Sequence, residues 1–190
     1  MPLVRRDPPR SPESTGVSAA VPFPRDLTCR TGAADDLGNA LEAEKDLRAR
    51  EALLAALVAI ADPSAAAALA RHLRSEDAWL RNACIEALQA MPAAASSVLP
   101  SLLTDADPDV RLLATEIVRT QPTEAANGML ASLLEHETHP NVCGAAVEVL
   151  AEVGMTDAVP ALRSARIRFA SESFLPLAID TVLARLGQER

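Results

Sequence analysis

Four acidic side chains at positions 105 to 116 have the spacing of calcium ligands. Asp105, Asp107, Asp109 and Glu116 occupy positions 1, 3, 5 and 12 of a calcium-binding loop pattern. Such a loop needs glycine at position 6 for its sharp turn, and this chain has Val110 there. We therefore interpret the cluster as an acidic turn before a helix. Asp109 is the expected N-cap, because its carboxylate can accept hydrogen bonds from the free backbone N–H groups of the first turn.

A second group, His136, His139 and Cys143, carries side chains of the kinds that bind zinc. A structural zinc site needs a fourth ligand, and a catalytic one needs rigid support for its three ligands. Pro140 and Asn141 lie between these residues and indicate a loop followed by a helix start. We therefore interpret all three as ordinary turn and helix residues, and we predict no metal site and no cofactor.

No arrangement of residues typical of a catalytic site is visible in the sequence. There is no Ser–His–Asp or Cys–His motif for a nucleophile and no glycine-rich loop for a phosphate. Cys29, Cys84 and Cys143 are widely spaced and form no paired motif, which favours a reducing compartment. The sequence therefore predicts no catalytic residues and a protein that is not an enzyme.

The N-terminal and apolar segments favour a cytoplasmic protein. Arg5 and Arg6 are not followed by the apolar stretch of a signal peptide, and charged residues interrupt every apolar stretch before it reaches membrane-spanning length. Nearly all basic residues are arginine, with Lys45 as the only lysine, which favours a bacterial source. We therefore expect a cytoplasmic location and no membrane partner.

The composition favours helices and argues against a nucleic-acid partner. The chain is 49% hydrophobic but has only three Phe, one Trp and no Tyr, so its core must consist mainly of Ala, Leu and Val. Small aliphatic side chains suit helices that pack at close range, which predicts an all-α fold. Residues 31–162 carry eight basic and twenty acidic residues, and such an acidic surface repels phosphate groups.

Apolar helical patterns recur along the chain with a nearly constant period. With the expected helix starts aligned on Arg50, Arg81, Arg111, Cys143 and Pro176, successive starts are 31, 30, 32 and 33 residues apart. A period of about 30 residues with two helices per unit is typical of an α-solenoid, in which each helix pair stacks on the next. The predicted fold class is therefore a right-handed α-solenoid of stacked antiparallel helix pairs.

Helix-breaking residues keep the same register and mark the second helix of each unit. They are Pro92, Pro122, Gly154 and Gly187, with Asp62-Pro63-Ser64 in the first unit. Pairs of apolar side chains at helical spacing accompany the second helices. The pairs are Leu37/Leu41, Leu69/Leu73, Leu99/Leu103, Leu130/Leu134 and Val159/Leu162.

These patterns divide the chain into an arm and a repeat domain. Residues 1–30 contain six prolines, which remove backbone donors, so we expect a flexible arm there. Residues 31–190 are expected to form a half-repeat, four helix pairs and a final helix. Within this domain, residues 163–174 form the longest connection and the expected irregularity.

The segment Asp107-Pro-Asp-Val-Arg111, with Ala114 three residues later, resembles the HEAT repeat in its short bacterial form. The resemblance covers residues 34–187. In HEAT repeats, an acid between the helices commonly pairs with the arginine six positions on, as Asp105 and Arg111 are spaced here.

The same spacing occurs in Glu44 and Arg50. The resemblance also implies two broken positions in this acid–arginine ladder. Ser75 replaces the acid ahead of Arg81, and Cys143 replaces the arginine after Glu137.

The resemblance implies a protein-binding module, so we expect a non-enzymatic scaffold or adaptor that binds another protein or peptide and is a monomer outside its complex. HEAT-like enzymes supply the alternatives. Deoxyhypusine hydroxylase uses several His-Glu dipeptides, and this chain has only His136-Glu137. HEAT-like DNA glycosylases need a basic, aromatic-bearing face, which this acidic chain lacks. A HEAT-like lyase or chaperone that acts on a bilin, another tetrapyrrole or a cofactor-bearing protein stays open.

In HEAT-like solenoids the second helices line the concave face, which places the expected partner-binding residues. Small and hydroxyl side chains prevail there, with a basic end at Arg71 and Arg74 that would meet an acidic segment of the partner. Alternatively, these arginines pair only with Glu76 and Asp77. The expected residues of this face are Arg71, Arg74, Ser97, Ser101, Thr104, Ser132 and Glu135.

Two further features lie outside these columns. Trp79, the single tryptophan, is a candidate anchor for a partner, although packing between turns is the commoner role. Glu86, Glu116 and Glu148 form a column that we expect on the convex face, as a solvated stripe without a partner.

Overall fold

The computed structural model describes residues 32–188, so the arm expected over residues 1–30 lies outside the described residues. Within the described part, all regular elements are helices and none is a strand, which confirms the all-α class. None of these helices is long and apolar enough to cross a membrane. The elements are α1 (Ala33–Ala43), α2 (Leu47–Ile60), α3 (Pro63–Ala70), the 3-10 helix η2 (Arg71–Arg74), α4 (Ala78–Gln89), α5 (Pro92–Ala95), α6 (Leu99–Leu103), α7 (Pro108–Val118), α8 (Thr123–His136), α9 (Pro140–Val153), the 3-10 helix η3 (Thr156–Ala158), α10 (Val159–Arg168) and α11 (Leu175–Gln188).

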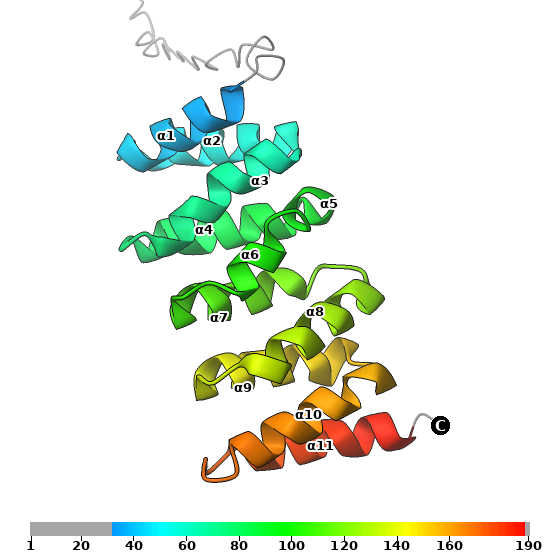
Figure 1. Ribbon diagram of the computed structural model, residues 1–190. Helices are drawn as coiled ribbons and strands as arrows, with labels where there is room; N and C mark the ends of the chain where they lie inside the picture. The colour runs from blue at the N-terminus through cyan, green and yellow to red at the C-terminus, as the bar shows by residue number, and fades with distance from the viewer. Residues whose placement is uncertain (1–31, 189–190) are drawn as a thin grey trace, which may run out of the picture.

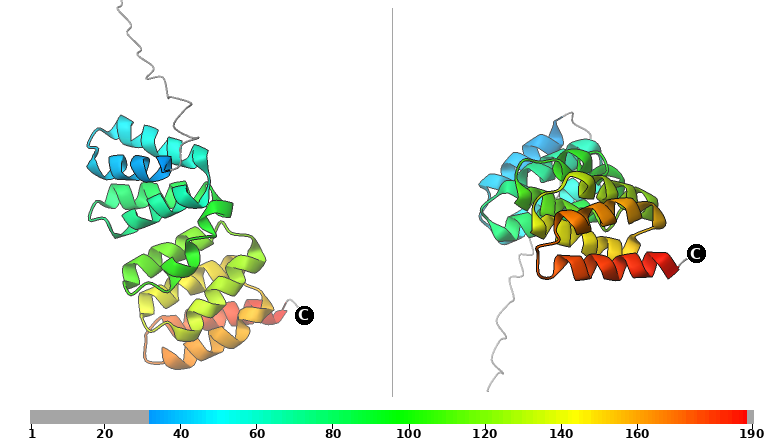
Figure 2. Two further views of the ribbon diagram at one scale, coloured as in Figure 1. Left: turned by 45° about the horizontal axis from the view of Figure 1, so that its top comes forward. Right: turned by 60° about the horizontal axis from the view of Figure 1, so that its bottom comes forward.

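The helices stack in chain order in two layers (Figure 1). The first helices of the units, α2, α4, α7, α9 and α11, pack against one another in one layer. The second helices, α1, α3, α5 with α6, α8 and α10, form the other layer. The turned view on the left of Figure 2 shows the same progression from α1 to α11. The solenoid predicted from the repeat period is therefore confirmed.

The first helices of four units keep one register. Arg50, Arg81, Arg111 and Cys143 are each the fourth residue of their helix, in α2, α4, α7 and α9 respectively. The sequence alignment of these four positions therefore matches the structure.

The last helix departs from this register. Pro176 is the second residue of α11, so the last step of the repeat is two residues longer than predicted. The connection before α11 is shorter than the predicted segment 163–174, because α10 continues to Arg168. Only residues 169–174 are irregular between the two helices.

The predicted helix breaks are correct at four positions and wrong at one, and at the first of them, Asp62-Pro63-Ser64, Asp62 is the N-cap of α3. Pro92 begins α5, Pro122 is the N-cap of α8, and Gly154 is the C-cap of α9. Gly187 is not a break, because it lies inside α11. It is the second-last residue of that helix, where glycine weakens few helical hydrogen bonds.

Aspartate N-caps begin three of the first helices, α2, α4 and α7, but the N-cap of α7 is not the predicted residue. Asp107 takes this place, and its carboxylate accepts a hydrogen bond from the N–H of Asp109 at 2.9 Å. Pro108 fixes φ and lacks an N–H, so it occupies the first helical position and the residue before it becomes the cap. Asp109, the predicted cap, is the second residue of α7. Asp46 and Asp77 cap α2 and α4 in the same way.

The apolar pairs of the second helices form the core between the two layers. Each leucine of the pairs in α3 with η2, in α6 and in α8 is buried, and these residues join one continuous cluster with the first helices. Neither helix of a unit could bury its apolar face alone, so stacking of successive units stabilises the fold.

The second helix of the unit that begins with α4 is divided into α5 and α6. The hydroxyls of Ser96 and Ser97 donate to the carbonyls of Ala93 and Ala94, each at 2.7 Å, and so compete with the helical pattern. Pro100 then occupies the second position of α6. The next second helix, α8, is continuous.

Candidate functional site

A hollow of about 630 Å³ lies on the second-helix layer between α6 and α8, and we call it the α6/α8 hollow. Leu103, Met129 and Leu133 give it apolar walls, and Thr104 and Ser132 lie at its rim. The structure therefore brings together Thr104 and Ser132, two of the residues expected to bind a partner.

Gly128 of α8 also lines the hollow and keeps it open. A Cβ atom placed on Gly128 would meet no atom within 4 Å. Another chain could therefore approach the backbone of α8 closely at this position.

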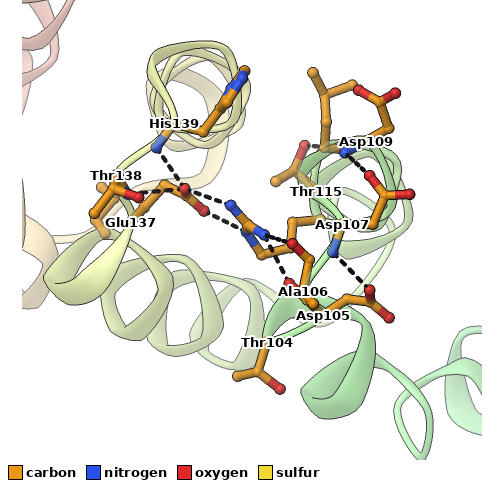
Figure 3. Close-up of polar contacts among 12 residues, drawn as sticks. Thr104, Asp105, Ala106, Asp107, Asp109, Thr115, Glu137, Thr138 and His139 are labelled. Carbon is orange, nitrogen blue, oxygen red and sulfur yellow. Dashed lines mark hydrogen bonds and ion pairs between the residues drawn. The ribbon is translucent and has the colours of Figure 1, made fainter.

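An ion pair between adjacent units also lines the hollow, and Figure 3 draws its hydrogen bonds. Arg111 of α7 donates from Nε and Nη2 to the carboxylate of Glu137, at 2.8 and 2.9 Å. The backbone N–H groups of Thr138 and His139 donate to the same carboxylate at 2.9 and 2.7 Å. The side chain of Glu137 is only 1% exposed, so this buried carboxylate is held by four hydrogen bonds.

The charges of this pair are stabilised in the folded chain. Burial by itself raises the pKa of Glu137, but the hydrogen bonds from Arg111 and from the N–H groups of His139 and Thr138 outweigh it, so the net shift is downward. The bond to Glu137 raises the pKa of Arg111 in turn. Both groups are therefore ionised at neutral pH, and the pair holds two units together rather than offering a free charge to a ligand.

The expected acid–arginine ladder is made differently from the prediction. Arg111 donates from Nη1 to the backbone carbonyl of Asp105 at 2.7 Å, not to its carboxylate. Arg81 makes the equivalent bond to the carbonyl of Ser75 at 2.5 Å. Because every residue has a carbonyl, serine at position 75 does not break the ladder.

Two arginines of this column, Arg50 and Arg111, also take a carboxylate partner from the next unit. Arg50 donates to the carbonyl of Glu44 at 2.7 Å within its own unit, and to the carboxylate of Asp77 at 2.7 Å in the following one. Arg111 and Glu137 repeat this inter-unit arrangement. The sequence spacing therefore found the arginine column but assigned it the wrong acceptor.

The other predicted gap, Cys143 in place of an arginine, is filled from a different helix. Arg168 at the end of α10 donates to the carbonyls of Leu134, Glu135 and Glu137 at 2.8, 2.7 and 3.1 Å. These carbonyls belong to the end of α8 and the loop after it, where a cation is favoured by the helix dipole. Sequence reasoning missed Arg168, because it lies 25 residues beyond the position that it replaces.

The hydroxyl groups expected on the second-helix layer donate into their own helices. Ser97 bonds the carbonyl of Ala94 at 2.7 Å, Ser101 that of Val98 at 2.8 Å, and Thr104 that of Pro100 at 2.9 Å. Their oxygen lone pairs stay available, so these groups present acceptors to a partner.

Ser97, Ser101 and Glu135 do not line the α6/α8 hollow. Glu135 is exposed on α8 beside His136, with 3.9 Å between its carboxylate and the Nε2 of that histidine.

The two arginines at the basic end are exposed but engaged. Arg71 donates to the carbonyl of Asp35 at 3.2 Å and lies over Gly38, where a Cβ atom would collide with its guanidinium group. Arg74 pairs with the carboxylate of Asp105. The alternative that both arginines pair only with Glu76 and Asp77 is wrong.

Trp79 lies on the opposite layer from the other expected residues. It is the second residue of α4 and is 37% exposed. The guanidinium group of Arg50 lies 5.5 Å from its ring centroid, a cation–π contact. Trp79 therefore cannot contribute to the same surface as Thr104 and Ser132.

The glutamate column on the first-helix layer is not a uniform solvated stripe. Arg119 pairs with Glu116 at 3.4 Å and with Glu148 at 4.0 Å, and it also pairs with Glu152. The third member of the column, Glu86, has no ion pair in the described part of the chain. The stripe is thus partly neutralised from within.

The residues with calcium-like spacing serve the backbone and one another. Asp105 accepts from the N–H of Asp107 at 2.9 Å, Asp107 caps α7, and Glu116 is paired with Arg119. Among residues 32–188, no group of three or more His, Cys, Asp or Glu side chains is placed to hold a metal ion.

The residues with zinc-like spacing differ strongly in solvent exposure. The side chain of His136 is 86% exposed, whereas Cys143 is completely buried in α9. Burial raises the pKa of the Cys143 thiol, and likewise that of Cys84, to about 12. Neither thiol is therefore poised as a nucleophile at neutral pH.

Comparison with known families supports the resemblance. Residues 95–168 match the family described as HEAT repeats. The matched segment reaches from the end of α5 to the end of α10, and it contains the α6/α8 hollow and the Arg111–Glu137 pair. None of the curated proteins or solved structures compared with the chain gives a match.

Proposed function

Since the chain carries HEAT repeats, which generally mediate protein–protein interaction, we propose that it is a non-enzymatic scaffold or adaptor. A partner polypeptide binds on the second-helix layer, with one of its apolar side chains in the α6/α8 hollow. The hollow itself is the observation that carries this proposal, because it combines apolar walls with an open approach to the backbone at Gly128.

The hydrogen-bonding character of the layer specifies the partner further. Ser101 and Thr104 already donate to their own helix, so they offer lone pairs. An extended segment that turns its backbone N–H groups toward them matches this surface. Arg71 and Arg74 lie farther along the layer, and their exposed guanidinium groups keep donors for an acidic part of the partner.

Replacement of Gly128 by leucine in the full chain tests the site. The side chain fills the hollow, while the open space at Gly128 and the better helix propensity of leucine leave the fold intact. Gly187→Leu is the matched control, because a Cβ atom at Gly187 also meets nothing within 4 Å, and that residue lies on α11 of the other layer.

Polypeptides captured from an extract of the native cell are compared for the three immobilised proteins. We expect the parent chain and Gly187→Leu to retain the same partner, and Gly128→Leu to lose at least about 90% of it, a tenfold fall in affinity. Circular dichroism confirms that each variant is folded. Equal capture by Gly128→Leu and the parent would show that the hollow is not the binding site.

A further inference from the structure

A second hollow, of about 590 Å³, lies on the first-helix layer between α2 and α4, and we call it the α2/α4 groove. Leu54 and Val58 of α2 give it an apolar wall. Trp79 of α4 borders it and leaves 37% of its surface exposed. The groove is separate from the α6/α8 hollow, because it belongs to the other layer and to other units.

Charge is distributed unevenly around this groove. Glu51 on α2 and Glu86 on α4 line it, both are exposed, and neither has an ion pair within residues 32–188. Arg50, the residue before Glu51, is committed to the carbonyl of Glu44 and the carboxylate of Asp77. The groove therefore joins an apolar wall to two carboxylates that make no ion pair with any residue in the described part.

The glutamate column on this layer, Glu86, Glu116 and Glu148, allows a comparison between units. Arg119 gathers the neighbouring glutamates, including Glu116 and Glu148, into one cluster of ion pairs. Glu86 is the equivalent of these residues in its own unit, but no arginine reaches it. The free carboxylates thus coincide with the exposed tryptophan and the groove.

We propose that the α2/α4 groove is a docking surface for a cationic polypeptide segment of a partner, one in which arginine or lysine alternates with apolar residues. The apolar side chain packs against Trp79 and the wall of α2, and the basic side chains pair with Glu51 and Glu86. Charge complementarity selects this occupant, because an acidic segment or a nucleic acid would meet two uncompensated negative charges. Trp79 supplies the kind of amphipathic surface on which binding energy concentrates.

The chain contains its own reporter for a test, because Trp79 is the single tryptophan. The full chain is titrated with an acetylated, amidated Leu-Arg-Leu-Arg-Leu peptide, with Leu-Glu-Leu-Glu-Leu as the charge control, and the emission of Trp79 is followed. We expect a saturable change with the arginine peptide only, weakened in about 0.5 M salt because the charges are exposed. Calorimetry measures the same affinity without the reporter.

The double variant Glu51→Gln/Glu86→Gln tests the assigned charges. It should raise the Kd for the arginine peptide about fivefold, the effect of two exposed ion pairs. Glu124→Gln/Glu172→Gln removes the same charge from exposed sites on α8 and before α11, and it should leave the Kd unchanged.

Several results would overturn the proposal. Equal binding of both peptides, or no emission change with either, would exclude a cationic occupant. Equal weakening in the two double variants would show only a general attraction to an acidic chain. A concentration-dependent emission change without peptide would indicate a second copy in the groove. Peptide binding by Gly128→Leu separates this surface from the one in the proposed function.

Discussion

The loops before α4 and α9 occupy equivalent places in two units but are held by different chemistry. Before α9, the buried carboxylate of Glu137 collects two bonds from Arg111 and two backbone N–H bonds. Before α4, Ser75 stands at that position, and the inter-unit pair is made instead by Asp77, whose side chain is 39% exposed. One fold therefore contains a strongly tied junction and a weakly tied one.

The difference between the two loops separates two roles of the acid–arginine ladder: an arginine–carbonyl bond and an arginine–carboxylate ion pair. The arginine of each unit bonds a backbone carbonyl of the preceding loop, as Arg81 and Arg111 both do, and this bond fixes the loop against the helix. At position 137 the acid adds a tie to Arg111, the arginine of the previous unit. Loss of the acid, as at Ser75, leaves the geometry intact but weakens the junction.

Of the changes that test this comparison, removal of the Glu137 carboxylate should lower the free energy of unfolding most. Glu137→Ala leaves Arg111, which is only 14% exposed, without its carboxylate and strands two backbone N–H groups. We expect a loss of about 3 kcal/mol in the free energy of unfolding, the low end for a buried pair because the hollow admits water. The corresponding fall in Tm is roughly 6–12 °C.

Glu124→Ala is the control, because Glu124 is an exposed residue of α8, and its effect should stay within about 0.5 kcal/mol. Thermal unfolding followed by circular dichroism measures both. A Tm for Glu137→Ala within 2–3 °C of the parent, roughly 1 kcal/mol, would mean that the two junctions are equally tied after all.

Acid should affect two parts of the stack in sequence, first the contact between η2 and α1 and then the loop before α9. His72 of η2 is buried and donates from Nε2 to the carbonyl of Gly38 at 3.0 Å. Burial lowers the pKa of His72 below 6.5, although the bond to Gly38 opposes the shift. Because the unfolded chain then binds the proton more readily, this stabilisation is complete above pH 6.5 and is lost as the pH falls below it.

Glu137 responds only at lower pH. Its pKa is depressed below 4.5, so its contribution is complete above that value and is lost as the pH falls through the folded pKa. Hydrogen exchange, corrected for its intrinsic pH dependence, should show α1 loosening as the pH falls below 6.5, while the N-terminal end of α9 stays protected down to pH 4.5. His72→Gln, which keeps a donor but does not titrate, should abolish the first change. Persistence of that change in the variant would assign it to another group.

The smallest effect is expected at the weak junction itself. Ser75→Ala keeps the carbonyl that accepts from Arg81 and removes only the hydroxyl that accepts from the N–H of Asp77 at 3.2 Å. We expect a change of less than about 0.5 kcal/mol in the free energy of unfolding. Chemical denaturation resolves this value, and a loss above 1 kcal/mol would show that the hydroxyl is part of the tie.

The repeat and its register follow from the sequence because they depend on local patterns. Four helix positions, from Arg50 to Cys143, share one place in their helices, and the buried leucine pairs follow the expected spacing. The predicted N-cap of α7, Asp109, lies two residues after the observed one. Pro108 marks the first helical position and so indicates Asp107 as the cap.

The candidate site is harder to predict from the sequence than the fold, because its features depend on contacts between units. The arrangement of Thr104 and Ser132 around one hollow follows from the register, since both belong to second helices. The burial of Glu137 depends on the conformations of long side chains. The same is true of the lack of an ion pair between Glu86 and Arg119. Many rotamers are compatible with the same sequence spacing, so the pattern alone cannot select their partners.

Arg168 has a consequence for the evolutionary modularity of this chain. Arrays of this kind grow by duplication of a unit, which presumes that each unit carries what it needs. The unit that begins at α9 has Cys143 where an arginine is usual, and the carbonyls at the end of α8 are satisfied by α10 instead. A copy of α9 spliced in without α10 would leave those carbonyls open, so the two helices form a single heritable module.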